Sequence, residues 1–237
     1  MHEPKKWRQT RISAPDGTPI TRDQSGMTRK TLVRSLAAAL IAVALAGCSE
    51  KVPKLPPLGA DDVIVAFGDS LTYGTGAEAE ESYPAVLAAL IGRKVVRAGV
   101  PGEVTAQGLA RLPSVIEAHD PRLVIVCLGG NDMLRKANET EIKENLRAII
   151  ATIRRRNIAV VLVGVPKASL IGGTPEFYAD LAAEFGIPYE GKILARVLYK
   201  SEYKSDTIHP NAKGYRKIAE AIAALLRKSG VVEPIGV

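Results

Sequence analysis

Short apolar runs alternate with amphipathic segments from about residue 62 to the end of the chain. Each run has the length of a buried strand, whereas the segments between them follow the period of an α-helix. Parallel strands that follow one another need a long crossover connection, which is usually a helix. The alternation therefore predicts an α/β fold with three α/β/α layers around a five-stranded parallel sheet. The expected strands are 63–67, 94–98, 123–128 and 159–165, with a weaker one at 187–189.

Five helices are expected between and after these strands, at 83–91, 105–118, 138–156, 174–185 and 211–228. Their ends have residues that are typical of helix caps. Gly92 follows the first helix, Thr105 is expected as the N-cap of the second, and Asn138 with Glu141 resembles a capping box for the third.

The first 47 residues do not follow this pattern. Residues 1–26 are polar and show neither a helical nor a strand period, so we expect a leader that is disordered or absent from the native protein. After Met27, three basic residues precede an unbroken apolar run at 36–46. This run is shorter than the roughly 20 residues that cross a bilayer, but it fits the hydrophobic region of a secretory signal. We therefore expect translation from Met27 and a signal peptide over 27–47.

The apolar run ends in Leu45-Ala46-Gly47-Cys48, which resembles the lipobox of bacterial lipoprotein precursors. The resemblance implies that Cys48 is lipidated and becomes the mature N-terminus, so that 48–61 form a lipidated, Pro-rich tether before a domain at 62–237. It also implies a periplasm-facing protein of the cell envelope, and the residue after the cysteine resembles patterns that direct sorting to the outer membrane. The alternative is a chance cysteine after an ordinary signal peptide.

Charge and cysteine content exclude several classes of protein. The formal net charge of +7 comes mainly from the leader, because the chain after residue 47 has 24 Lys or Arg against 22 Asp or Glu, a net charge of +2. The mature chain therefore does not have the basic character of a nucleic-acid-binding protein. Its second cysteine, Cys127, lies in an apolar run. A disulfide within the mature chain and a Cys-rich metal site are thus excluded.

Small and polar residues follow the predicted strands. Gly68-Asp69-Ser70 follows the first, Gly99 to Gly102 the second and Gly129 to Asp132 the third, while a fourth group at 206–210 precedes the last helix. In open α/β sheets, ligands bind outside the carboxyl ends of the strands. We therefore expect these groups to meet in one site.

A serine hydroxyl needs a base within hydrogen-bond reach and a third group that orients the base. Of the three histidines, His2 lies in the leader and His119 ends a predicted helix away from the strand ends, which leaves His209 as the base for Ser70. Asp206 stands three residues before His209, and an irregular turn can bring its carboxylate onto the imidazole. The alternative is that Asp206 and His209 only cap the last helix.

Acyl transfer also needs hydrogen-bond donors for the developing oxyanion. The Ser70 backbone N–H at a helix start, the backbone at Gly102 and the side-chain amide of Asn131 are the candidates. Each alone is equally typical of a turn. Their placement after consecutive strands favours a shared site.

Four segments in this order, FGDSLTYG, AGVPGEVT, LGGND and DTIHPN, resemble the sequence blocks of the GDSL or SGNH hydrolase family. The similarity extends over about 62–228 and is greatest to the branch of bacterial arylesterases, lysophospholipases and thioesterase I. It implies a flavodoxin-like α/β/α fold, catalysis without metal or cofactor, and Ser70, His209 and Asp206 as nucleophile, base and orienting group. It also implies an oxyanion hole formed by Ser70, Gly102 and Asn131.

Two departures from the family pattern stand out. Many members have Asn three residues before the Gly-Val of the second block, where this chain has Val96-Arg97-Ala98 ahead of Gly99. The loop at 166–175 lacks the Pro-Pro-Asn of many relatives. Because this loop would border the acyl group, the preferred chain length does not transfer from the family.

Other functions have less support in the sequence. The Gly-x-Ser-x-Gly turn of α/β-hydrolases is absent, since Thr72 stands where its second glycine should be. The Gly74-Thr75-Gly76 stretch lacks the rest of a nucleotide-binding motif. A binding lipoprotein without turnover and a deacetylase of O-acetylated cell-wall sugars remain as alternatives. We expect a serine esterase that acts on small acyl or aryl esters or on lysophospholipids, is a monomer and binds no nucleic acid.

Overall fold

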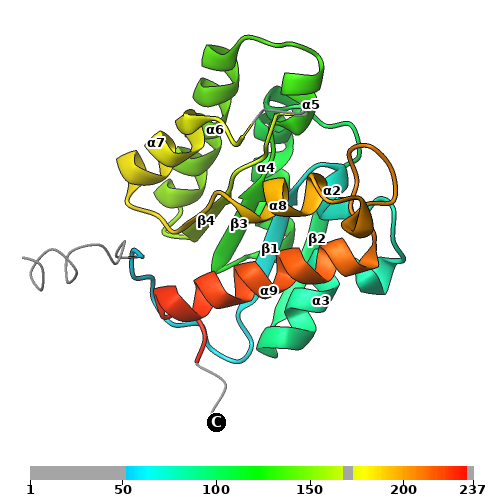
Figure 1. Ribbon diagram of the computed structural model, residues 1–237. Helices are drawn as coiled ribbons and strands as arrows, with labels where there is room; N and C mark the ends of the chain where they lie inside the picture. The colour runs from blue at the N-terminus through cyan, green and yellow to red at the C-terminus, as the bar shows by residue number, and fades with distance from the viewer. Residues whose placement is uncertain (1–51, 168–172, 234–237) are drawn as a thin grey trace, which may run out of the picture. The chain divides into compact units, whose positions relative to one another are not determined.

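The computed structural model describes residues 52–167 and 173–233. The expected leader, signal peptide and lipidated Cys48 lie outside these residues. Five parallel strands form one sheet in the order β2-β1-β3-β4-β5, which confirms the predicted fold class (Figure 1). The strands are β1 (Val63–Gly68), β2 (Lys94–Gly99), β3 (Leu123–Cys127), β4 (Ala159–Val163) and β5 (Tyr189–Glu190).

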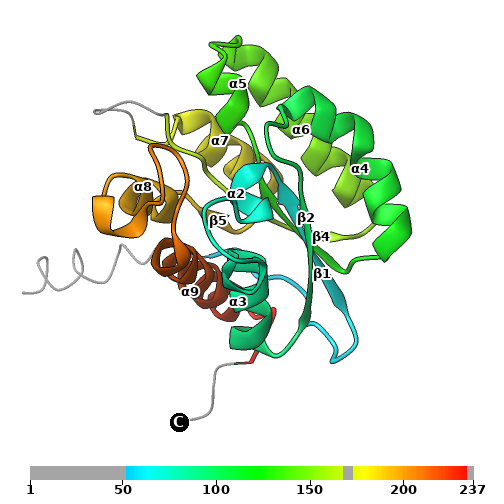
Figure 2. The same ribbon diagram turned by 90° about the vertical axis from the view of Figure 1, so that its right-hand side faces the viewer.

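Helices cover both faces of the sheet (Figures 1 and 2). The helices α3 and α9 pack together on one face, whereas α4 and α6 pack together on the other, where α7 contacts α6. The principal helices are α3 (Tyr83–Ile91), α4 (Thr105–His119), α6 (Glu139–Arg155), α7 (Glu176–Phe185) and α9 (Ala212–Ser229). This is the three-layer arrangement that the alternation of strands and helices predicts.

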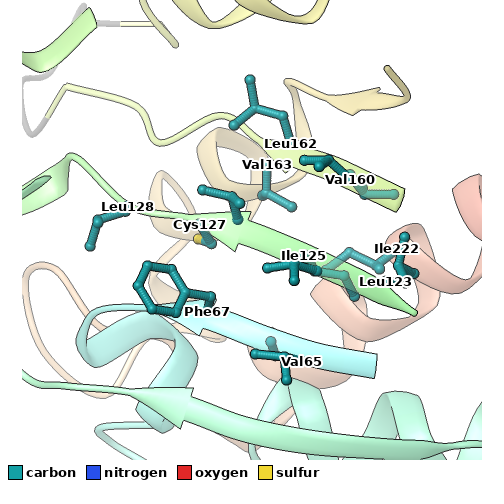
Figure 3. Close-up of a cluster of buried hydrophobic side chains, with 14 of the residues drawn as sticks. Val65, Phe67, Leu123, Ile125, Cys127, Leu128, Val160, Leu162, Val163 and Ile222 are labelled. Carbon is teal, nitrogen blue, oxygen red and sulfur yellow. The ribbon is translucent and has the colours of Figure 1, made fainter. Parts of the chain in front are cut away.

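The core lies between the sheet and the two helical layers. The three central strands β1, β3 and β4 are almost fully buried, as expected for parallel strands that are covered on both faces. Figure 3 shows their side chains in contact, with Phe67 beside Leu128 and Cys127 and with Ile222 of α9 near Leu123. Cys127 is free and buried, which agrees with its expected role as a small apolar residue.

Five short helical elements were not predicted from the sequence. They are α2 (Ser70–Tyr73), α5 (Gly130–Leu134), α8 (Ile193–Leu198), and the 3₁₀ turns η1 (Ala79–Glu81) and η2 (Ser201–Tyr203). None is long enough to show a helical period in the sequence. Two of them, α2 and α5, begin at or beside the residues proposed for the site.

The caps of two helices differ from the prediction, and α7 begins at Glu176, two residues later than predicted. The N-cap of α4 is Val104, so the expectation for Thr105 is wrong: Thr105 is the first helical residue, and its N–H and hydroxyl both donate to the buried Asp132 carboxylate. The Asn138 side chain does cap α6 by accepting from the Thr140 N–H, without the reciprocal Glu141 contact of a capping box.

The Pro-rich segment at 52–58, expected as a tether, packs against the end of α9. The Leu55 N–H donates to the Ser229 carbonyl at 3.0 Å and the Leu58 N–H to the Val231 carbonyl at 2.9 Å. Val52, Leu55 and Leu58 are half-buried against the core. This segment is therefore docked on the folded domain.

Helices able to cross a bilayer, judged by length and apolar character, were not found in the part of the chain that the structure describes.

Candidate active site

The carboxyl ends of β1 and β3 meet where the strand order reverses, and Ser70 and Asn131 follow these two strands. Ser70 is the first residue of α2, which starts one residue after β1. A side chain at Gly68 would come within 2.4 Å of the Thr72 Oγ1 of α2, and one at Gly99 within 2.2 Å of the Tyr73 nitrogen of α2. These glycines are therefore required for α2 to lie so close to the strand ends.

Ser70, His209 and Asp206 form a continuous chain of hydrogen bonds. The Ser70 Oγ lies 3.0 Å from His209 Nε2, and His209 Nδ1 lies 2.7 Å from Asp206 Oδ2. An ionised carboxylate only accepts hydrogen bonds, so the hydrogen is on Nδ1 and Nε2 is left to accept the Ser70 proton. The structure thus brings together the three residues that the sequence singled out for this purpose.

The turn at 206–209 fixes this arrangement. The second oxygen of Asp206 accepts from the backbone N–H groups of Ile208 and His209, each at 2.8 Å. Partial burial opposes ionisation, but the hydrogen bonds from the His209 ring and these amides outweigh it and lower the pKa of Asp206. The alternative in which Asp206 and His209 only cap the last helix is wrong, because Asn211 is the N-cap of α9.

The three candidate oxyanion donors differ in how far they are already bonded. Within residues 52–167 and 173–233, neither the Ser70 N–H nor the Gly102 N–H has a hydrogen-bond acceptor. Gly102 has a φ of +80°, a conformation that favours glycine. By contrast, the Asn131 Nδ2 lies 3.0 Å from the Glu103 carbonyl oxygen and 3.4 Å from Asp69 Oδ2. Its position is therefore defined by neighbouring acceptors.

Ser70 and His209 open into a cavity of about 480 Å³. Its wall is mainly apolar, and two of its large apolar side chains, Leu134 and Tyr199, are 45% and 48% exposed. Two lysines, Lys167 and Lys204, also line it. The apolar wall residues are Leu71, Leu134, Val165, Pro166, Leu198, Tyr199 and Ile208.

A buried carboxylate lies directly beside Ser70. Asp69 is 1% exposed, and its Oδ1 caps α2 by accepting from the Leu71 N–H at 3.0 Å. Burial raises its pKa to about 7; the Leu71 N–H opposes this shift, and the neighbouring charges of Glu103 and Asp132 add to it. The sequence pattern placed Asp69 in the group that follows the first strand but assigned it no role, because an aspartate before a helix is usually a solvated cap.

Two further charged residues near the site were missed. Glu103, 4% exposed, forms an ion pair with Arg111 of α4. The sequence does not show that Glu103 is buried, because burial of a charged side chain depends on the tertiary fold. Its position directly after Gly102 is the one feature of the sequence that points to it. His119, excluded as a base, is the last residue of α4 and lies about 20 Å along that helix from Thr105, given a rise of about 1.5 Å per residue.

No group of three or more potential metal ligands occurs among the residues that the structure describes.

The sequence of this chain is similar to those of known esterases and acylhydrolases. The sequence model of the GDSL-like Lipase/Acylhydrolase family matches residues 66–217. Thioesterase 1/protease 1/lysophospholipase L1 of Escherichia coli is 33% identical over 176 residues, which cover 71% of this chain and 85% of that protein. Esterase TesA of Pseudomonas aeruginosa is 31% identical over 199 residues, covering 78% of this chain and 98% of the relative.

Solved structures agree with these sequence matches. AlinE4, described as an SGNH-hydrolase family esterase, superposes with a TM-score of 0.56 at 31% identity and covers 75% of this chain and 100% of its own. The psychrotrophic esterase EstA from Pseudoalteromonas sp., solved with monoethylphosphonate as inhibitor, has a TM-score of 0.63 at 23% identity and covers 71% and 98%. At that identity, EstA supports the fold alone.

Proposed function

Because the chain belongs to the GDSL-like lipase/acylhydrolase family and is a serine ester hydrolase, we propose that it cleaves carboxylic esters through an acyl-enzyme on Ser70. The observation that carries the proposal is the continuous Ser70–His209–Asp206 chain at the edge of an apolar cavity. Each of the three groups has the contact that its role requires.

In the first half of the reaction, Ser70 Oγ forms a bond to the ester carbonyl carbon while its proton moves to His209 Nε2. The carbonyl electron pair moves to oxygen, and the resulting oxyanion is stabilised by the N–H groups of Ser70 and Gly102 and by the Asn131 amide. When the intermediate collapses, the bond to the leaving alcohol breaks and His209 returns the proton to the alcohol oxygen. The product is an acylated Ser70.

In the second half, water replaces the alcohol. His209 takes a proton from the water as its oxygen attacks the acyl carbon, and the bond from Ser70 Oγ to that carbon then breaks. Ser70 regains the proton, and the carboxylic acid leaves. Throughout, Asp206 keeps His209 in one tautomer and stabilises the imidazolium that forms in each half.

The substrate is proposed to be an acyl or aryl ester with an apolar acyl group, including lysophospholipids. The cavity wall supports this choice, because Leu198, Tyr199 and Ile208 offer apolar surface to an acyl chain beside the reacting groups. Relatives named arylesterase, from Vibrio mimicus, and lysophospholipase, from E. coli, act on ester classes of this kind by their names. The cavity volume is within the range of small-molecule sites.

The proposal is tested by hydrolysis of p-nitrophenyl acetate, butyrate and octanoate by residues 49–237, compared with the Ser70→Ala variant. This fragment keeps the docked segment at 52–58. Turnover should fall by at least about 1,000-fold in the variant, as when a catalytic triad loses its nucleophile. Equal rates for the two proteins would refute the role of Ser70, and the ratio of rates among the three esters ranks the acyl lengths.

The lipid anchor on Cys48 and the periplasm-facing envelope location are part of the same proposal. They are supported by the lipobox-like sequence alone. Three residues separate Cys48 from the docked Val52, so that the two Cα atoms are at most about 14 Å apart. An anchored protein would then hold its folded unit close to the bilayer surface.

A further inference from the structure

Arg111 lies on α4 behind the carboxyl ends of β1 and β2. Its Nη2 donates to the Gly68 carbonyl at 3.2 Å and to the Ala98 carbonyl at 2.9 Å. Gly68 is the last residue of β1, and Ala98 is the last but one of β2. The guanidinium also stacks over the Phe67 ring, 4.2 Å from its centroid. One side chain therefore joins the ends of two neighbouring strands.

The same guanidinium binds Glu103 through two parallel hydrogen bonds. Nε lies 2.5 Å from Oε1 and Nη2 lies 2.7 Å from Oε2, the two-point geometry that only arginine provides. Glu103 is 4% exposed. A buried ion pair often contributes no more to stability than apolar side chains of the same volume. What the pair does contribute is a fixed position for the segment that carries Glu103.

That segment holds two of the three proposed oxyanion donors in place. Gly102 immediately precedes Glu103, and the Glu103 backbone carbonyl accepts from Asn131 Nδ2 at 3.0 Å. Asn131 and Gly102 come from different strand ends. The Glu103 carbonyl joins the two ends from the part-buried side, and Arg135 adds an exposed contact by donating to the Gly102 carbonyl at 2.9 Å. The Arg111–Glu103 pair links the part-buried contact to the rigid sheet.

Resting on the function proposed above, we propose that Arg111 is a positioning residue for the oxyanion hole and acts through Glu103. It holds the Gly102–Glu103 turn against the ends of β1 and β2, and the Glu103 carbonyl in turn orients the Asn131 amide. Arg111 does not touch the substrate. Its loss should therefore weaken transition-state stabilisation and leave substrate binding in the ground state unchanged.

The test variant is Arg111→Lys, which keeps the charge but cannot make the two-point contact and the carbonyl contacts together. We expect kcat for p-nitrophenyl butyrate to fall about 10- to 100-fold and KM to stay within twofold of the parent value. This loss of kcat is smaller than the 10²- to 10³-fold that follows complete loss of one oxyanion donor. The matched control is Arg147→Lys. Arg147 is 29% exposed against 23% for Arg111, and it pairs with Glu184 between α6 and α7, away from the site. Its kcat should stay within twofold of the parent.

A double-mutant cycle separates positioning from general destabilisation. Asn131→Ala removes one of the two donors that Arg111 positions, so Arg111→Lys should lower kcat by a smaller factor in the Asn131→Ala background than in the parent. An equal loss in both backgrounds, or an Arg111→Lys kcat within twofold of the parent, would overturn the proposal. If Arg111→Lys does not fold, Glu103→Gln replaces it in the same cycle with the same expectations, since it keeps the side-chain shape and loses the charge.

Failure of the proposed function gives a different result. Unchanged turnover in Ser70→Ala would refute the serine mechanism. An unchanged kcat in Asn131→Ala would refute only the donor role of Asn131. The test of Arg111 would then be whether Arg111→Lys lowers kcat while the Arg147→Lys control does not.

Discussion

The free energy of unfolding should depend on pH through Asp69, a buried residue beside Ser70. Its carboxyl group is buried between the end of β1 and Asn131, and its pKa is raised to about 7 from the ordinary value of 3.8. The folded protein therefore retains a proton on Asp69 at pH values where the unfolded chain has lost it. This contribution to stability is complete below about pH 4 and is lost as the pH rises through about 7.

The Asp69→Asn variant should lack this dependence on pH. Asn cannot ionise, so the stability of the variant relative to the parent should increase between pH 4 and 8, measured as the difference in free energy of unfolding by urea. The Asn oxygen can still accept from the Leu71 N–H, but its NH2 group cannot accept from Asn131 Nδ2. This lost contact adds an offset that does not vary with pH, and only the slope tests the assignment. A difference that stays constant over this range would contradict the raised pKa.

The reacting residues could be inferred from the sequence, whereas those that support them could not. Ser70 was found because it follows an apolar run in a short motif. His209 and Asp206 were found because only one histidine was available as base and an aspartate stands three residues before it. Asp69, Glu103 and Arg111 are charged residues that ordinarily lie in solvent. Their burial results from the close approach of α2, α4 and the strand ends, which no local pattern encodes.

At the scale of elements, prediction succeeded where the hydrophobic period extended over several turns. The limits of α3 were predicted to the residue, and the central strands were identified as continuous apolar runs. The strand predicted at 159–165 is shorter, because the chain leaves the sheet after Val163 to form the cavity wall at Val165 and Pro166. The single turn α2 lies below the length at which a period can be recognised, although it carries Ser70.

The segment at 52–58 is a case in which composition misled. Its prolines predicted a tether, but the Leu55 and Leu58 N–H groups donate to the carbonyl groups of Ser229 and Val231 at the end of α9. The chain is thus attached at the C-terminal end of α9, while Asn211 at the other end of that helix follows the His209 turn. An α-helix of 18 residues is about 27 Å long, which is the approximate separation of these two features.

For the whole molecule, the proposed anchor has a direct test. When the full chain is expressed in a Gram-negative host, Cys48→Ala should prevent lipidation and move the protein from the membrane fraction to the soluble fraction, or leave it unprocessed. Lipidation provides more than one acyl chain, and two chains are enough for stable attachment. The parent protein is the control, and unchanged fractionation of the variant would refute the anchor on Cys48 without bearing on esterase activity.

The central claim is that Ser70 forms the covalent intermediate, and phosphonate labelling tests it most directly. Residues 49–237 would be treated with a p-nitrophenyl alkylphosphonate, and the adduct located by peptide mass spectrometry, with Ser114→Ala, an exposed serine of α4, as the control variant. We predict one phosphonyl group per chain, on Ser70, in the parent and in the control, and none in Ser70→Ala. Equal labelling of Ser70→Ala, or an adduct on another residue of the parent, would contradict the account.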